Sequence, residues 1–152
     1  MIYKHLVAEI KQNVERFSTK KAIYLKNDVL NSWEGISWTD FGERIEKLSK
    51  ALLNFGIKEQ ENIGIFAENM PEWIISDISI MGIRAVTIPI YATNSKKETE
   101  YLVNDAEIPV LFVGGQPEYD KALEILSTNT YLKLIVALHS DIKIQDSESS
   151  VY

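Results

Sequence analysis

The pattern of apolar and polar positions predicts a helix and a β-hairpin at the start of the chain. Apolar residues recur every three or four positions along the predicted helix: Tyr3, Leu6, Ile10, Val14 and Phe17. Two runs rich in Ile, Tyr and Trp follow, at residues 22–26 and 32–38, with the turn-prone pair Asn27 and Asp28 after the first. This arrangement favours two strands joined as a hairpin.

The next segment carries the clearest helical pattern. One apolar stripe runs along it: Phe41, Ile45, Leu48, Leu52 and Phe55. Two Glu–Lys pairs four positions apart support the same helix: Glu43 with Lys47, and Glu46 with Lys50. Thr39 is the expected N-cap, and Gly56 is expected to end the helix in a left-handed conformation.

From Asn62 onward, short apolar runs alternate with helical segments. The predicted strands are 63–67, 85–90, 110–113 and 132–138, and the predicted helices are 71–83, 96–105 and 118–126. The helices have recognisable start signals: Pro71, the capping box Ser95-x-x-Glu98, and Pro117. Such a β-α-β series requires parallel strands with right-handed crossovers. We therefore predict an α/β fold, an open doubly wound and mostly parallel sheet with helices on both faces, preceded by a helix, a β-hairpin and an amphipathic helix.

This reading divides the chain into residues 1–58, residues 59–140 with the β-α core, and a polar tail at 141–152. The length of 152 residues and the 45% apolar content suit a single globular unit. The net charge of −6 argues against a nucleic-acid partner. The absence of cysteine excludes disulfides, thiolate zinc sites and cysteine nucleophiles. We see no signal peptide or membrane-spanning stretch, and expect a cytoplasmic protein with peripheral membrane contact left open.

Ligands of open α/β sheets bind beyond the carboxyl ends of the strands. The residues placed there are Glu68 and Asn69, residues 91–94, Gly114 and Gly115, and residues 139–141. No glycine-rich phosphate motif is present, so we interpret Gly114 and Gly115 as a strand-to-helix turn. His5 and His139 lack metal-ligand spacing and are expected to bind no metal.

The acidic and aromatic candidates also have structural explanations. Glu98, which could pair with Glu100, belongs to the capping box, and Glu72, which could pair with Glu68, lies in a first helical turn where acids are favoured. Two aromatic residues near strand ends could border a ligand channel, Trp73 and Tyr91, although burial against the sheet is the favoured role of Trp73. No Ser-His-Asp set can be assembled. We therefore assign no catalytic, cofactor-binding or metal-binding residue.

Five phrases of the sequence match a known family in order and spacing. They are ISWTDF at 36–41, ALLNFGI at 51–57, IGIFAENMPEW at 63–73, VTIPIYAT at 86–93 and EYLVNDA at 100–106. Together they resemble the N-terminal portion of the AMP-forming acyl-CoA synthetases, in the adenylate-forming superfamily of luciferases and peptide-synthetase adenylation domains. The sequence at 69–73 and 89–93 is most similar to that of the long-chain fatty acid branch.

The resemblance implies a two-step ligase reaction. A fatty acid carboxylate attacks the α-phosphate of Mg-ATP to give an acyl-adenylate and pyrophosphate, and the thiol of coenzyme A then displaces AMP. The family's phosphate loop, magnesium glutamate, ribose aspartate and lid lysine all follow the matched portion, so none maps onto this chain. The resemblance thus implies an N-terminal fragment of a fatty acid–CoA ligase, inactive alone and expected to bind none of these cofactors.

The resemblance also implies that the first fifty-odd residues pack with a sheet formed by later sequence. Without it, the stripe from Phe41 to Phe55 and the hairpin residues Trp33 and Trp38 must pack on residues 62–138 in a new way or be covered by another chain. We predict self-association from this stripe. Two other interpretations stay open, namely a stand-alone flavodoxin-like or nucleotide-binding module and a dimerisation domain.

Overall fold

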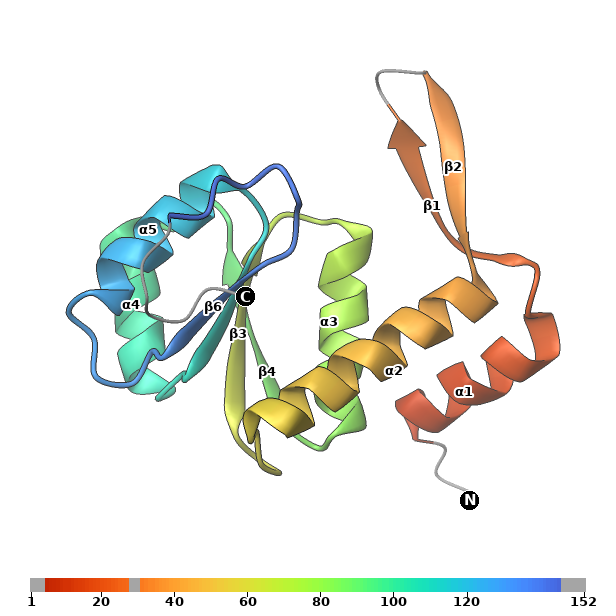
Figure 1. The fold of residues 1–152 in the computed structure, drawn as a ribbon, viewed down its shortest axis with the longest axis horizontal. Coiled ribbons are helices and arrows are strands. Elements are labelled where there is room, and N and C mark those ends of the chain that lie inside the picture. Colours follow the sequence, from red (N-terminus) through yellow and green to blue (C-terminus); the bar gives the residue numbers. More distant parts are fainter. Residues whose placement is uncertain (1–4, 28–30, 146–152) are drawn as a thin grey trace.

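The computed structural model describes residues 5–27 and 31–145 (Figure 1). The N-terminal elements are α1 (Leu6–Phe17), β1 (Lys21–Asn27), β2 (Ser32–Ser37) and α2 (Trp38–Phe55). The β-α series follows as β3 (Asn62–Ala67), α3 (Pro71–Gly82), β4 (Val86–Tyr91), α4 (Lys96–Asp105), β5 (Val110–Val113), α5 (Gln116–Leu126) and β6 (Leu134–Ala137). None of the described helices combines the length and apolar character needed to cross a membrane.

The four strands of the β-α series form one parallel sheet in the order β4-β3-β5-β6. This confirms the predicted fold class. In the register of the sheet, Ile65 of β3 lies beside Pro89 of β4 and Phe112 of β5. Pro89 stands on an edge strand, where proline is tolerated because a central strand would lose a ladder hydrogen bond.

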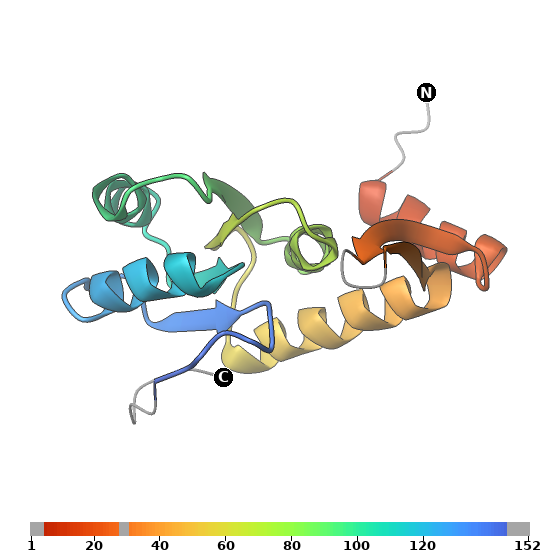
Figure 2. The same ribbon diagram turned by 90° about the horizontal axis from the view of Figure 1, so that it is seen from above.

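Each face of the sheet is covered by its own pair of helices (Figure 2). Because side chains alternate along a strand, Ile65 of β3 faces α2 and α3, whereas Phe66 faces α4 and α5. Both side chains are fully buried. Burial on both faces explains why the sequences of β3 and β5 are almost wholly apolar and do not alternate.

The N-terminal elements form a third apolar cluster with α3. Its buried members are Ile36, Phe41, Ile45, Ile75 and Ile78. The predicted stripe of α2 is therefore covered by α3 and the sheet along most of its length, and of its members only Phe55, at the C-terminal end of the helix, is exposed. Of the two packings foreseen for this stripe, the structure shows the one within the chain. Ser49 of α2 reinforces the contact, because its hydroxyl donates to the Ser79 carbonyl oxygen of α3 at 3.0 Å.

Several predicted boundaries need correction. The N-cap of α2 is Ser37 and not Thr39, because the Ser37 hydroxyl accepts a hydrogen bond from the Asp40 amide at 3.0 Å. The Thr39 hydroxyl instead donates to the Ser18 carbonyl oxygen. Trp38, placed in a strand by its aromatic character, is the first residue of the helix. Tyr3 and Asp28 lie outside the described residues.

Other local signals are confirmed. Gly56 ends α2 with φ of 101°, the left-handed conformation that favours glycine. Ser95 and Glu98 form the capping box of α4, with the side chain of each bonded to the backbone amide of the other. Pro71 and Pro117 lie in the first turns of α3 and α5.

Candidate functional site

The carboxyl ends of β3, β5 and β6 meet at one edge of the sheet and surround two adjoining hollows. The first, of about 390 Å³, is lined by Glu68, Asn69, Met70, Gly114, Gly115, Pro117 and Glu118. The second, of about 290 Å³, is lined by Gly114, Gly115, Gln116, His139, Asp141 and Ile142. The topology thus brings together most of the strand-end residues that the sequence singled out. Tyr91, at the end of β4, stands apart and is 82% exposed, so it does not line an enclosed channel.

Gly114 allows two strand ends to approach closely between these hollows. A Cβ atom on Gly114 would lie 2.5 Å from the Cβ and 3.0 Å from the Cα of Ala67, so any larger residue would push β3 and β5 apart. The Gly114 amide donates to the Phe66 carbonyl oxygen at 3.0 Å and ties the two ends together. The glycine pair is a strand-to-helix connection, as predicted, with a steric requirement that sequence inspection did not foresee.

The N-terminus of α5 is occupied by a side chain of its own first turn. Glu118 is buried, and its Oε2 atom lies 2.7 Å from the position that a Cβ on Gly115 would take. The carboxylate therefore folds back over the positive end of the helix, where acidic groups are stabilised. A phosphate approaching the same amides would meet this negative charge, so the described residues do not form a phosphate-binding loop.

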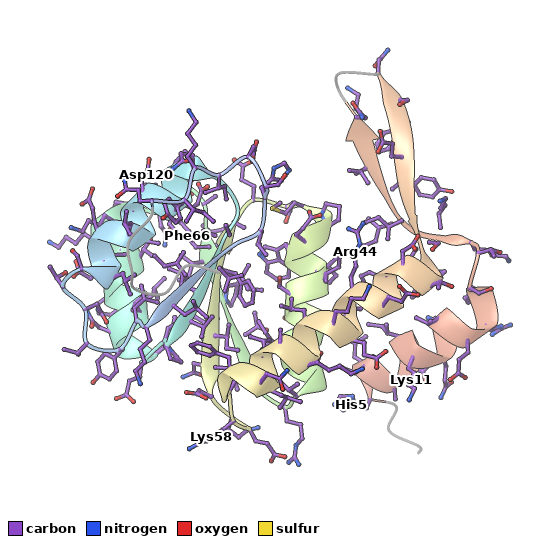
Figure 3. All side chains as sticks on the ribbon, viewed as in Figure 1. His5, Lys11, Arg44, Lys58, Phe66 and Asp120 are labelled. Atoms are coloured by element: carbon purple, nitrogen blue, oxygen red, sulfur yellow. The ribbon has the colours of Figure 1, made fainter. Side chains whose placement is uncertain are left out.

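His139 and Asp141 form a short pair at the end of β6. The Nδ1 atom of His139 lies 2.6 Å from Oδ1 of Asp141, and both side chains are exposed to solvent. His5 lies at the start of α1, in the part of the molecule away from the sheet, so the two histidines are not brought together (Figure 3). Within 5–27 and 31–145, no group of three His, Asp or Glu side chains is placed to hold a metal ion.

The remaining acidic candidates are engaged in structural roles. Glu98 accepts hydrogen bonds from the Ser95 amide at 2.8 Å and the Ser95 hydroxyl at 2.7 Å, and these bonds hold the pKa of its carboxyl below the usual range. Glu72 lies 3.8 Å from a guanidinium nitrogen of Arg44 and links the start of α3 to α2. These contacts give both carboxylates a structural role.

Trp73 packs against the apolar cluster on the α2–α3 face of the sheet and is half-buried. Its favoured role in packing agrees with this position.

A third, larger hollow of about 920 Å³ lies nearby and was not foreseen. It runs from the hairpin residues Trp33 and Trp38 past Met70 to His139 at the strand-end edge. Only the tertiary fold brings these segments together, because nearly seventy positions separate Met70 from His139 in the sequence.

Comparison with families of known proteins gives a match over almost the whole chain. The family model described as "AMP-binding enzyme" matches residues 10–150. The human "Long-chain-fatty-acid--CoA ligase ACSBG2" is 29% identical over 115 residues, which are 76% of this chain and 17% of that protein. "Fatty acyl-CoA synthetase A" of Dictyostelium discoideum is 34% identical over 105 residues, which are 69% of this chain and 15% of that protein. The chain thus spans less than one fifth of the length of these relatives.

Solved structures share the fold. The coronafacic acid ligase of Pectobacterium brasiliense superimposes with a TM-score of 0.83 at 21% identity, covering 95% of this chain and 27% of that one. The anthranilate CoA ligase AuaEII, in complex with anthranoyl-AMP, gives a TM-score of 0.78 at 20% identity over 90% of this chain and 25% of that one. At this level of identity the likeness concerns the fold alone.

Proposed function

The chain belongs to the AMP-binding enzyme family, and from that premise we propose that it is part of a fatty acid–CoA ligase. In the proposed reaction a fatty acid and ATP form an acyl-adenylate and pyrophosphate, and coenzyme A then takes the acyl group and releases AMP. The match over residues 10–150, together with relatives that are named long-chain fatty acid–CoA ligases, is the observation that carries this proposal. The same proposal places the reaction in the cytoplasm.

We propose that residues 1–152 alone do not catalyse this reaction. The helix N-terminus at the strand-end edge is covered by Glu118, and the described residues supply no metal-ligand set. ATP, Mg²⁺ and coenzyme A would therefore be held by sequence that lies beyond the part shared with this chain, since the relatives are more than five times as long as the matched segment.

The role proposed for this segment is that of a scaffold for one wall of the active site. The sheet fixes the ends of β3, β5 and β6 relative to one another, with Gly114 setting the spacing of β3 and β5. Strands and helices hold site residues in a more precise position than loops do. This precision matters because misplacement of reacting groups by about 1 Å can lower the rate on the order of a hundredfold.

Exchange of radiolabelled pyrophosphate into ATP, in the presence of a long-chain fatty acid, tests the proposal. We expect no exchange by residues 1–152 and fatty acid-dependent exchange by a longer chain with the downstream sequence. Exchange by the short chain would contradict its inactivity. Absence of exchange by the longer chain with any fatty acid would contradict the ligase assignment.

Calorimetric titration of residues 1–152 with ATP separates the scaffold from a stand-alone nucleotide-binding module. We expect no heat of binding, because the carboxylate of Glu118 lies at the one glycine-flanked helix N-terminus of the strand-end edge described here. Saturable binding of ATP would favour the nucleotide-binding module. A Glu118→Gln variant serves as a matched control, since it removes the charge and keeps the size of the side chain.

A further inference from the structure

One carboxylate of the strand-end edge is buried without a partner. Glu118 is the only buried charged side chain among the residues that the structure describes, with 9% of its surface exposed. Within residues 5–27 and 31–145, no N–H or O–H group donates to this carboxylate, and no basic side chain forms an ion pair with it. Buried charges in proteins are normally paired and hydrogen-bonded, because an unpaired charge loses its hydration without compensation. Glu118 therefore has the acceptor capacity for a partner that the described residues do not supply.

The surroundings of Glu118 in α5 make this exception clear. The other charged side chains of the helix all interact with a neighbour: Asp120 with Gln116, Lys121 with the Asn94 carbonyl oxygen, and Glu124 with Lys96. The positive end of the helix stabilises Glu118, whose Oε2 atom lies 2.7 Å from where a Cβ on Gly115 would be. The Tyr119 amide of the same turn donates to the Gly115 carbonyl oxygen instead. A carboxylate offers about four acceptor sites, so the helix end alone does not satisfy it.

The hollow that Glu118 lines suits a positively charged occupant. This is the hollow of about 390 Å³ at the ends of β3 and β5, and its one other charged lining residue is Glu68, which is also negative. No lysine, arginine or histidine is among its described lining residues, whereas Asn69 adds a polar amide. His139 lines the adjoining hollow and lies 2.6 Å from Asp141, so that imidazole already has a carboxylate partner. The hollow is thus negative and has space for far more than one water molecule, whose share of liquid volume is about 30 Å³.

We propose that this hollow binds a guanidinium group, with Glu118 as its principal acceptor and Glu68 as a second negative charge. A guanidinium presents parallel N–H donors that match the two oxygens of a carboxylate. A metal ion fits the lining less well, because only two carboxylates border the hollow. The same group can come from a small molecule or from an arginine side chain in sequence outside residues 1–152. The inference rests on Glu118 and its hollow and is independent of the ligase assignment.

Amide NMR spectra of ¹⁵N-labelled residues 1–152 test this binding. The probe is methylguanidinium chloride, and NaCl at equal ionic strength is the reference, because salt alone screens charges. We expect saturable shifts of the Gly114 and Gly115 amides, with a dissociation constant of roughly 1–10 mM, as two charge-assisted hydrogen bonds would give. Tetramethylammonium has the same charge but no N–H donor, and it should bind at least about tenfold more weakly.

Three variants assign the binding to individual carboxylates. Glu118→Gln removes the buried charge and should weaken methylguanidinium binding at least about tenfold. Glu68→Gln should weaken it about twofold to threefold, because this residue supplies a nearby charge. Asp105→Asn makes the same change in net charge at the exposed last residue of α4 and should bind like the parent chain. Melting temperatures show whether each variant is folded, and the tetramethylammonium comparison decides on the parent chain if Glu118→Gln is not.

A longer chain that continues past residue 152 distinguishes the two sources of the guanidinium group. If an arginine of the later sequence occupies the hollow, the longer chain should bind methylguanidinium at least about tenfold more weakly than residues 1–152, because the two groups compete. If the natural ligand is a small molecule, both chains should bind the probe equally. Either result, after binding to residues 1–152, supports the proposal.

Three results would overturn the proposal. The first is the absence of saturable shifts when residues 1–152 are titrated with methylguanidinium. The second is equal binding of tetramethylammonium, which would show attraction by charge alone. The third is unchanged methylguanidinium binding by a folded Glu118→Gln variant, because the probe would then lie elsewhere.

Discussion

The sheet region and the hairpin region bury their apolar residues in different ways. In the sheet region, Ile65 and Phe112 are fully covered by helices of the same chain. In the hairpin region, α1 has no buried residue, and Trp33 and Tyr24 are largely exposed. Both regions are built from clear secondary-structure signals. The local sequence pattern thus determines whether a helix or strand forms. The elements that pack against it determine how much its burial stabilises the fold.

The largest difference in stability is expected between a substitution in the sheet region and one in the hairpin region. Phe112→Ala removes a fully buried ring from the centre of the sheet and should lower the free energy of unfolding by about 3–5 kcal/mol. Trp33→Ala removes an exposed ring and should change it by less than about 0.5 kcal/mol. Urea unfolding followed by circular dichroism measures both. Similar losses in the two variants would show that the hairpin face is covered in solution and would contradict the comparison.

A substitution at the junction should uncouple the regions. Phe41 is buried where the hairpin, α2 and α3 meet. Its ring packs edge-on against the ring of Trp38, with 5.9 Å between the ring centroids. Phe41→Ala should cost roughly 3 kcal/mol, and hydrogen exchange should accelerate in α1 and the hairpin while β3 and β5 stay protected. Uniform acceleration would instead indicate one cooperative unit. The division of the chain near residue 58 stays a prediction that this measurement tests.

Removing one helix cap in either region should cause a smaller loss of stability, of the same size in both regions. Ser37 caps α2 in the hairpin region, and Ser95 caps α4 in the sheet region. Replacing either serine by alanine should lower the free energy of unfolding by about 1 kcal/mol at neutral pH. Thr39→Ala is the control for Ser37, because its hydroxyl does not cap the helix. A larger loss for Thr39→Ala than for Ser37→Ala would contradict the cap assignment.

The smallest effect concerns pH. Hydrogen bonds from Ser37 hold the pKa of Asp40 below its usual range, and those from Ser95 do the same for Glu98. A carboxyl whose pKa is lower in the folded state stabilises the fold above its unfolded-state pKa and loses this contribution as pH falls through the folded-state pKa. The gap in melting temperature between the parent and each serine variant should therefore narrow as the solution is acidified below about pH 4, and the part that remains reflects the hydrogen bond from the backbone amide to the serine hydroxyl. A gap of the same size at neutral pH and in acid would show that the carboxylates contribute nothing.

Much of the fold follows from the sequence because its signals are local. The range of β5 was predicted without error at 110–113, and that of α4 at 96–105, since an apolar run and a capping box mark them. The start of α2 was misplaced because Ser37 and Thr39 are both good caps, and only the hydrogen bond to Asp40 distinguishes them.

The features that were missed depend on contacts between distant segments. The sequence did not show which element of residues 62–138 covers the stripe of α2, which is α3. It also did not show that Gly114 lies against Ala67, more than forty positions away. The sequence did place the strand-end candidates at one edge, because parallel topology determines that edge. It could not show that Glu118 folds back over the helix N-terminus, since the same residue type in a first turn can also point into solvent.

Pro89 makes the two rims of the sheet unequal. It interrupts the amide series of β4, one of the two outer strands, whereas β6 on the opposite rim contains no proline. Strand pairing from outside is thereby discouraged on one rim and left open on the other. The rim formed by β6 keeps a complete series of backbone amides. A further strand, whether from the same polypeptide or from a neighbouring molecule, would therefore pair with β6 more readily than with β4.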